Sequence, residues 1–106
     1  MEKKEILRTL RRARNALRRR KLCQGGYCKG AQTNPTHLCA FGALNFAMSK
    51  NAWVTHPDHH VVAARLQWAL SRSFLGITDF NDDEGTTKRK VIALFNRAIK
   101  LVQKET

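Results

Sequence analysis

Residues 36–48 read Thr-His-Leu-Cys-Ala-Phe-Gly-Ala-Leu-Asn-Phe-Ala-Met, a stretch that is apolar on nearly every side of a helix. A helix that is apolar all round has to be surrounded by other elements, so this segment predicts the central helix of the fold. Gly42 and Ala43 have the smallest side chains in it, and they would let a neighbouring segment approach closely. We therefore expect the rest of the chain to pack around this helix.

Three further segments place apolar residues at intervals of three and four, which is the spacing of one helix face. They span about residues 2–22, about residues 57–74, and the stretch that follows a capping threonine at Thr86 or Thr87. The side chains expected to face inward are Ile6, Leu10, Ala13 and Leu17 in the first segment, Val62, Leu66, Ala69 and Leu70 in the second, and Val91, Leu94, Phe95, Ala98, Leu101 and Val102 in the third.

Two segments rich in turn-forming residues separate these helices. In residues 24–36 the pair Gly25-Gly26 is expected to end the first helix, and residues 76–85 are expected to form a loop. The sequence does not alternate between apolar and polar residues with the period of a strand. It therefore predicts a single helical domain over residues 1–106. The expected fold class is all-α, a compact bundle of about four helices.

The charge of the chain is concentrated at one end. The 106 residues carry 20 Lys and Arg against 8 Asp and Glu, a net charge of +12, and residues 1–22, an arginine-rich amphipathic helix, hold +8 of it. Because clustered cations bind phosphates and release their counterions, we expect this helix to contact nucleic acid or another acidic macromolecule. A solvated helix face and an anionic membrane surface are the alternatives. The candidate binding residues are Arg8, Arg11, Arg12, Arg14, Arg18, Arg19 and Arg20.

Four of the eight acidic residues lie within residues 79–84. This acidic segment could meet the basic helix of a second copy, so self-association is a further expectation. No stretch reaches the roughly 18 apolar residues of a membrane span, and the first residues lack the apolar block of a signal peptide. We therefore expect a cytoplasmic protein without a membrane span.

The three cysteines suggest two kinds of chemistry. Cys23, Cys28 and Cys39 form a Cys₃His set with His37, but the set lacks the Cys-x₂-Cys spacing of zinc sites, so we expect no metal and no cofactor. Cys39 lies near the start of the predicted central helix, where free backbone N–H groups would lower the pKa of its thiol and allow a thiol enzyme. A buried cysteine that packs as a small apolar side chain is the simpler interpretation.

Several short motifs run from Gln24 to Leu101. They are Gln24-Gly25, then Cys39-Ala40-Phe41-Gly42-Ala43-Leu44, then Phe80-Asn81-Asp82 followed by Gly85 and Thr87. In this pattern the chain resembles a family of small uncharacterised bacterial and phage proteins that has no assigned activity. The resemblance implies a shared fold and a cluster of polar residues at helix ends, and it implies no reaction.

The polar residues of these motifs allow two interpretations. Gln24, Asn81 and Asp82 can satisfy backbone groups at helix ends and bond from one loop to the other. Alternatively, with Gly25 and Cys39 they line a pocket for a small ligand such as a nucleotide. We expect a small basic binding protein and not an enzyme, in the setting of a phage or mobile-element accessory protein that acts on a host complex. The alternative functions are a small-ligand binder and a thiol enzyme.

Overall fold

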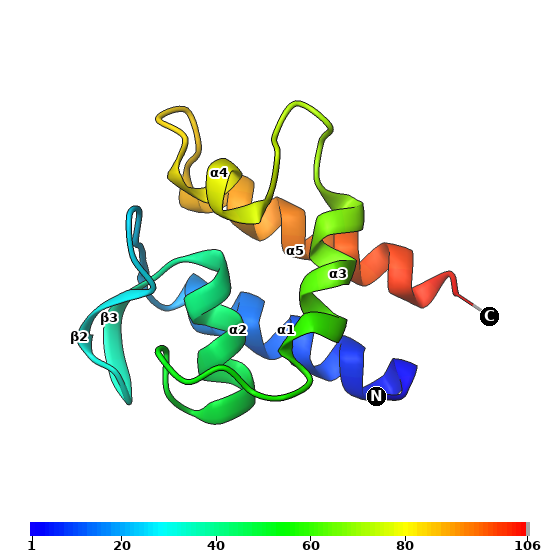
Figure 1. Cartoon of the computed structure of the whole chain (residues 1–106), viewed down its shortest axis with the longest axis horizontal. Coiled ribbons are helices and arrows are strands. Elements are labelled where there is room, and N and C mark those ends of the chain that lie inside the picture. The colour runs from blue at the N-terminus through cyan, green and yellow to red at the C-terminus, as the bar shows by residue number, and fades with distance from the viewer. Residues whose placement is uncertain (106) are drawn as a thin grey trace.

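Two long amphipathic helices, α1 (Lys3–Arg18) and α5 (Lys88–Gln103), pack against each other and form one layer of the fold (Figure 1). The structure, a computed structural model, describes residues 1–105. The second layer contains α2 (Ala40–Ser49), which packs on α1, and α3 (His59–Ala69), which packs on α5. None of the helices within the described residues has the length and the apolar character that crossing a membrane requires.

A small mixed sheet lies at one end of the helices (Figure 1). It consists of β1 (Lys21–Leu22), β2 (Cys28–Ala31) and β3 (Asn34–Leu38). β3 is the middle strand, and it runs parallel to β1 and antiparallel to β2. The fold is therefore α+β, and the predicted all-α bundle is wrong. The strands are short, mostly exposed, and contain glycine, asparagine and proline, so no alternating pattern marks them in the sequence.

The first helix ends at Arg18, before the predicted boundary at residue 22 and without the help of the glycine pair. The side chain of Arg20 donates through Nη1 to the carbonyl of Ala16, at 3.0 Å. Lys88 Nζ donates to the carbonyls of Arg18 and Arg20, at 2.9 Å each. Because these side chains satisfy carbonyls that a helix end leaves free, the chain can turn directly into β1.

The segment predicted as a loop after α3 contains a short helix, α4 (Ile77–Asp82). Ile77, Phe80 and Asn81 are buried on one side of it, and the Phe80 ring packs edge-on against Phe74 with 5.1 Å between the ring centres. Burial of this face stabilises a helix that is too short and too rich in turn-forming residues to be predicted from local preference.

The remaining helices follow the predictions more closely. α3 is shorter than the predicted 57–74, but Val62, Leu66 and Leu70 are buried as expected. α5 begins after Thr87, whose Oγ1 accepts from the backbone N–H of Lys90 at 3.4 Å. Its inward face includes the buried Ile99, whereas Leu101, predicted to face inward, is 42% exposed.

The predicted central helix is confirmed as α2, which contacts α1, α3, α4 and β3. It begins at Ala40, because residues 34–38, partly assigned to it from the sequence, form β3. Gly42 lies directly against the backbone of Tyr27, so that a Cβ at this position would be 2.0 Å from the Tyr27 carbonyl oxygen. The close approach predicted at Gly42 thus brings the β1–β2 connection onto α2.

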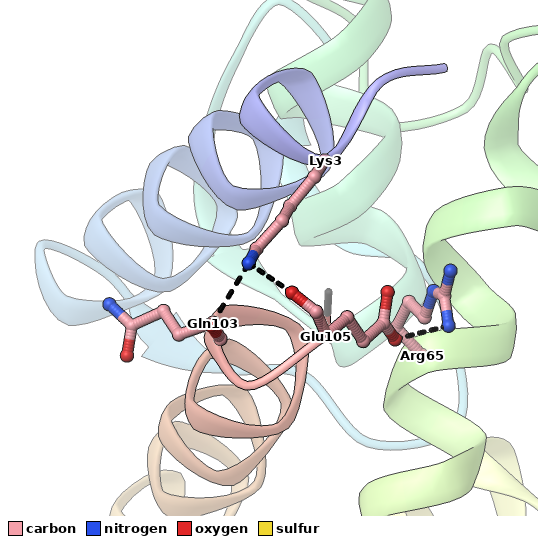
Figure 2. A network of polar contacts seen from close by, with 4 residues as sticks. All are labelled: Lys3, Arg65, Gln103 and Glu105. Carbon is pink, nitrogen blue, oxygen red and sulfur yellow. Dashed lines mark hydrogen bonds and ion pairs between the residues drawn. The ribbon is translucent and has the colours of Figure 1, made fainter.

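Both ends of the chain lie away from the sheet and are tied together (Figures 1 and 2). Lys3 Nζ donates to the carbonyl of Gln103 at 3.0 Å and to the carbonyl of Glu105. The carboxylate of Glu105 in turn forms an ion pair with Arg65 of α3. Figure 2 shows these contacts joining the start of α1, the end of α5 and the middle of α3.

Candidate functional site

The first candidate site is the exposed face of α1. Five of the seven predicted arginines are exposed to solvent on this helix or at its C-cap, and they are Arg8, Arg11, Arg12, Arg18 and Arg19. Within residues 1–105 the structure contains a single ion pair, which joins Arg65 to Glu105 near the start of α1 and involves none of these five arginines. No carboxylate of the described residues therefore forms an ion pair with the arginines of the α1 face.

The other two predicted binding residues hold the fold together. Arg14 is partly buried and donates through Nη1 to Asn96 Oδ1 of α5 at 3.0 Å. Burial, followed by the charges of two neighbouring arginines, lowers the pKa of its guanidinium. Arg20 lies over the ring of Phe46, 4.7 Å from its centre, and donates through Nε to the carbonyl of Pro35 at 2.8 Å. These contacts leave both side chains less free to bind a phosphate.

A basic groove runs between α1 and α2 and has a volume of about 540 Å³. It is lined by Arg12, Asn15, Ala16, Arg19, Arg20, Phe46, Ala47 and Lys50. Lys50 was not predicted as a binding residue. It follows α2 with a left-handed backbone (φ 57°), which turns the chain at the groove. Four cationic side chains, one from α1 and three from the residues that directly follow α1 and α2, thus line one concave surface.

The second candidate site is the junction of the sheet, α2 and α4, where the motif residues meet. The amide of Asn81, which is 2% exposed, donates to the carbonyl of Cys23 at 2.9 Å and accepts from the backbone N–H of Ala40 at 2.9 Å. Ala40 is the first residue of α2, so its N–H has no partner within the helix. One buried side chain therefore joins three segments of the chain.

The predicted bonds between the two loops are present. Gln24 Nε2 lies within hydrogen-bond distance of the carbonyls of Asn81 at 3.0 Å, Asp83 at 2.9 Å and Thr86 at 3.3 Å. Asp82 Oδ1 accepts from the backbone N–H of Gly25 at 2.9 Å and from Asn81 Nδ2 at 3.0 Å. Gln24 and Asp82 thereby connect the loop after β1 to α4 and the turn that follows it.

Cys39 is the N-cap residue of α2. Its buried Sγ accepts from the backbone N–H of Gly42 at 3.2 Å, in the place where a serine or aspartate oxygen commonly accepts. The N–H groups of the helix lower the pKa of the thiol, as predicted, but burial has the larger effect and raises it to about 11. The thiol is therefore protonated at neutral pH, which is the opposite of what a nucleophile requires.

A cavity of about 350 Å³ opens at this junction, and we call it the junction pocket. It is lined by Gly25, Gly26, Tyr27, Cys39, Ala40, Phe41, Trp53, Ile77, Thr78, Asn81 and Asp82. Four of the five predicted pocket residues line it, whereas Gln24 lies outside the wall and bonds to backbone carbonyls instead. Asp82 is the one charged residue among the lining residues.

The pocket walls include residues that were not predicted from the sequence. Tyr27 and Trp53 are 38% and 50% exposed, and their rings meet edge to face with 5.2 Å between centres. Both lie outside the helices, so no helical periodicity marks them. Each of the two aromatic residues lies near glycine, asparagine or serine in the sequence. This combination is the signal that could have indicated a ligand-binding loop.

The structure does not arrange the zinc candidates as a metal site. Among residues 1–105 no group of three or more histidine, cysteine, aspartate or glutamate side chains is placed to hold a metal ion. Cys23, Cys28 and Cys39 are free thiols, and His37 Nδ1 is 2.8 Å from Thr36 Oγ1.

The sequence matches a family model described as Family of unknown function (DUF6197) over residues 1–101. The chain belongs to this family. The match begins at residue 1, so the family region includes α1, whereas the motifs noted in the sequence begin only at Gln24. No curated protein and no solved structure matches the chain. The residues that match the family model thus include both candidate sites, the arginine face of α1 and the junction pocket.

Proposed function

We propose that this protein binds nucleic acid through the exposed arginine face of α1 and the basic groove between α1 and α2. The observation that carries the proposal is a set of five exposed arginines that form no ion pair within residues 1–105: Arg8, Arg11, Arg12, Arg18 and Arg19. A guanidinium group can donate two parallel hydrogen bonds to the oxygens of one phosphate, and it stays charged at every physiological pH. The backbone of a nucleic acid presents many phosphate groups in a row, so it can occupy several of these arginines at once.

The arrangement of the charges supports a backbone-tracking mode of binding. Arg8 and Arg12 lie on one side of α1, and the C-cap residue Arg19 follows seven residues after Arg12 on the same side. Arg12 and Arg19 also line the basic groove. Lys50 extends this charge from α1 onto α2. A row of cations of this kind contacts phosphates, and phosphate contacts carry no sequence information, so we expect affinity that varies little with base sequence.

The proposed location of the protein is the cytoplasm. Its small size and basic charge suggest an accessory protein of a phage or mobile element. Its three free cysteines suit a reducing compartment. An acidic protein surface is the competing partner, because it would satisfy the same arginines. Self-association through the acidic segment 79–84 would use this face too and would compete with nucleic acid.

The experiment measures binding of a fluorescently labelled 20-base-pair duplex and a 20-nucleotide single strand by anisotropy, with light scattering to detect self-association. The test variant replaces Arg8, Arg11, Arg12, Arg18 and Arg19 with Gln. We expect it to lose at least 100-fold in affinity at about 50 mM salt, because it removes the cations that would neutralise about five phosphates.

A charge-matched control separates a site from the effect of total charge. It replaces five exposed cations outside α1 with Gln: Lys29, Arg72, Arg89, Lys100 and Lys104. The affinity of the control for the probes should fall by less than about 10-fold, since the replaced residues contribute only long-range attraction. Equal losses in the two variants, or no binding of either probe by the unaltered protein, would contradict the proposal.

A further inference from the structure

We infer that the junction pocket binds a small organic cation, an amine or guanidine with an aromatic or short aliphatic body. Its aromatic walls would receive the body, and the carboxylate of Asp82 would receive the cationic head. This inference is independent of nucleic-acid binding, because the pocket shares no lining residue with the basic groove.

The charge of the pocket selects for a cation. The protein carries 20 lysines and arginines, yet none of them lines this cavity, and its one charged residue is Asp82. Oδ1 of Asp82 is held by the backbone N–H of Gly25 and by Asn81 Nδ2, which fixes the direction of the carboxylate. Oδ2 has no hydrogen-bond partner within residues 1–105 and is left to accept from a ligand.

The negative charge reaches the floor of the pocket. Burial is the main reason that the pKa of the Cys39 thiol is raised, and the charge of Asp82 adds to the same shift. The floor beside Cys39 therefore lies in the field of Asp82, and an anionic ligand such as a free nucleotide would meet repulsion there instead of a phosphate-binding cation.

The aromatic walls suit the body of such a ligand. Aromatic ring faces attract cations as well as apolar groups, and three aromatic residues, Tyr27, Phe41 and Trp53, are among those that line the cavity. The backbone of Tyr27 is fixed by the contact of its carbonyl with Gly42 and by the bond that it accepts from Cys39 N at 3.1 Å. Trp53 N donates to Asn51 Oδ1 at 2.9 Å, which fixes the second wall.

The size of the cavity limits the ligand. A volume of about 350 Å³ is at the lower end of the roughly 300–1,000 Å³ of small-molecule sites. It accommodates a single ring with a short side chain, since an apolar cavity of about 150 Å³ already holds benzene. We therefore choose probes with one ring and a two-carbon or three-carbon arm.

Three probes with nearly the same body and different charge test the inference: phenethylamine, 2-phenylethanol and 3-phenylpropionate. Binding is followed by the fluorescence of Trp53 in a Trp68→Phe background, because the protein has two tryptophans and Trp68 lies outside the pocket. We expect phenethylamine to bind saturably and roughly 10-fold or more tightly than the alcohol, the gain of a charge-assisted hydrogen bond. 3-Phenylpropionate should bind more weakly than the alcohol.

Two matched variants in this background locate the cation. Asp82→Asn removes the charge but keeps an Oδ1 that can accept from Gly25 and Asn81. It should lower the affinity for phenethylamine about 10-fold and leave the affinity for 2-phenylethanol unchanged. Asp79→Asn removes an equal charge from the same helix but outside the pocket wall, and it should leave both ligands unchanged. The inference is wrong if phenethylamine and 3-phenylpropionate bind with equal affinity, or if phenethylamine causes no saturable change in fluorescence. It is also wrong if the two variants lose equal affinity for phenethylamine.

Discussion

Gly42 is the residue on which the contact between the sheet region and α2 depends. A Cβ at this position would lie 2.0 Å from the carbonyl oxygen of Tyr27, far inside any real contact, and that atom belongs to backbone that cannot rotate away. Gly42→Ala should therefore lower the free energy of unfolding by about 2–3 kcal/mol, at the upper end of overpacking effects. Urea denaturation followed by circular dichroism measures the change.

A second glycine provides the control for this substitution. A Cβ on Gly26 would meet only Cys23 Sγ, at 3.9 Å, which is an ordinary contact. Gly26→Ala should leave the free energy of unfolding within about 0.5 kcal/mol of the unaltered protein, as substitutions away from packed features do. If Gly42→Ala were as well tolerated as Gly26→Ala, the packing described at Tyr27 would be wrong.

His59 gives the protein a pH dependence whose sign follows from its burial. Its Nδ1 is buried and has no hydrogen-bond partner among the described residues, and its ring packs against Phe41 with 5.3 Å between centres. Burial, and then the charge of His60, lowers the pKa of His59 in the folded protein. The unfolded chain therefore binds the proton first, and stability should fall as the pH drops below about 6.5, the ordinary histidine value.

His59→Phe keeps a ring beside Phe41 and removes the titrating group. Urea denaturation at about pH 7.5, 6.5 and 5.5 should show a smaller loss of stability on acidification in this variant than in the unaltered protein. Identical losses in the two proteins would show that His59 is not the group responsible.

At the scale of elements, the buried amide of Asn81 connects α4 to α2 and to the loop after β1. Asn81→Ala would leave the carbonyl of Cys23 and the N–H of Ala40 buried without partners, at a cost of about 1–3 kcal/mol for each group. We expect a loss of about 2–5 kcal/mol in the free energy of unfolding, a large part of the stability of a small domain.

The comparison variant is Gln24→Ala, which removes bonds at the solvent-exposed side of the same junction. Water can replace Gln24 as a donor to these carbonyls, so this variant should lose no more than about 1 kcal/mol. Hydrogen exchange would locate the effect of Asn81→Ala, with the first turn of α2 losing protection. An Asn81→Ala loss no larger than that of Gln24→Ala would contradict the role given to the buried amide.

The elements also show what sequence reasoning can reach. The inward faces of α1 and α3 were predicted because a helix of three or more turns repeats its apolar spacing several times. α4 and the strands are too short to repeat a pattern, and Pro35 and Gly30 oppose strand formation locally. These elements form because the packing of Gly42 and the bonds of Asn81 fix the chain between the helices.

The same distinction applies to the junction pocket. Gly25, Cys39, Asn81 and Asp82 were predicted to lie together because they belong to recognisable motifs at helix ends. The aromatic walls were missed, since the positions of Tyr27 and Trp53 depend on backbone contacts between residues distant in the sequence. A motif indicates which residues meet, whereas the shape of a cavity requires the fold.

At the scale of the whole molecule, charge and shape divide the surface into two sites of opposite preference. Arginines of α1 and Lys50 form a concave basic surface, while the junction pocket has one carboxylate and no cation in its wall. The net charge of +12 is therefore not spread evenly over the protein. The two proposed partners, a polyanion and a small cation, thus belong to separate surfaces, and we expect the binding of one to leave the binding of the other unchanged.

The salt dependence of nucleic-acid affinity tests the central claim most directly. The dissociation constant for the 20-base-pair duplex would be measured between about 50 and 200 mM salt. With about five phosphates neutralised by the α1 face, the logarithm of the association constant should fall with a slope near −4.5 against the logarithm of salt concentration. The five-arginine variant should lose most of that slope and the charge-matched control should keep it. A slope shallower than about −1 in the unaltered protein, or an equal loss of slope in both variants, would contradict the account.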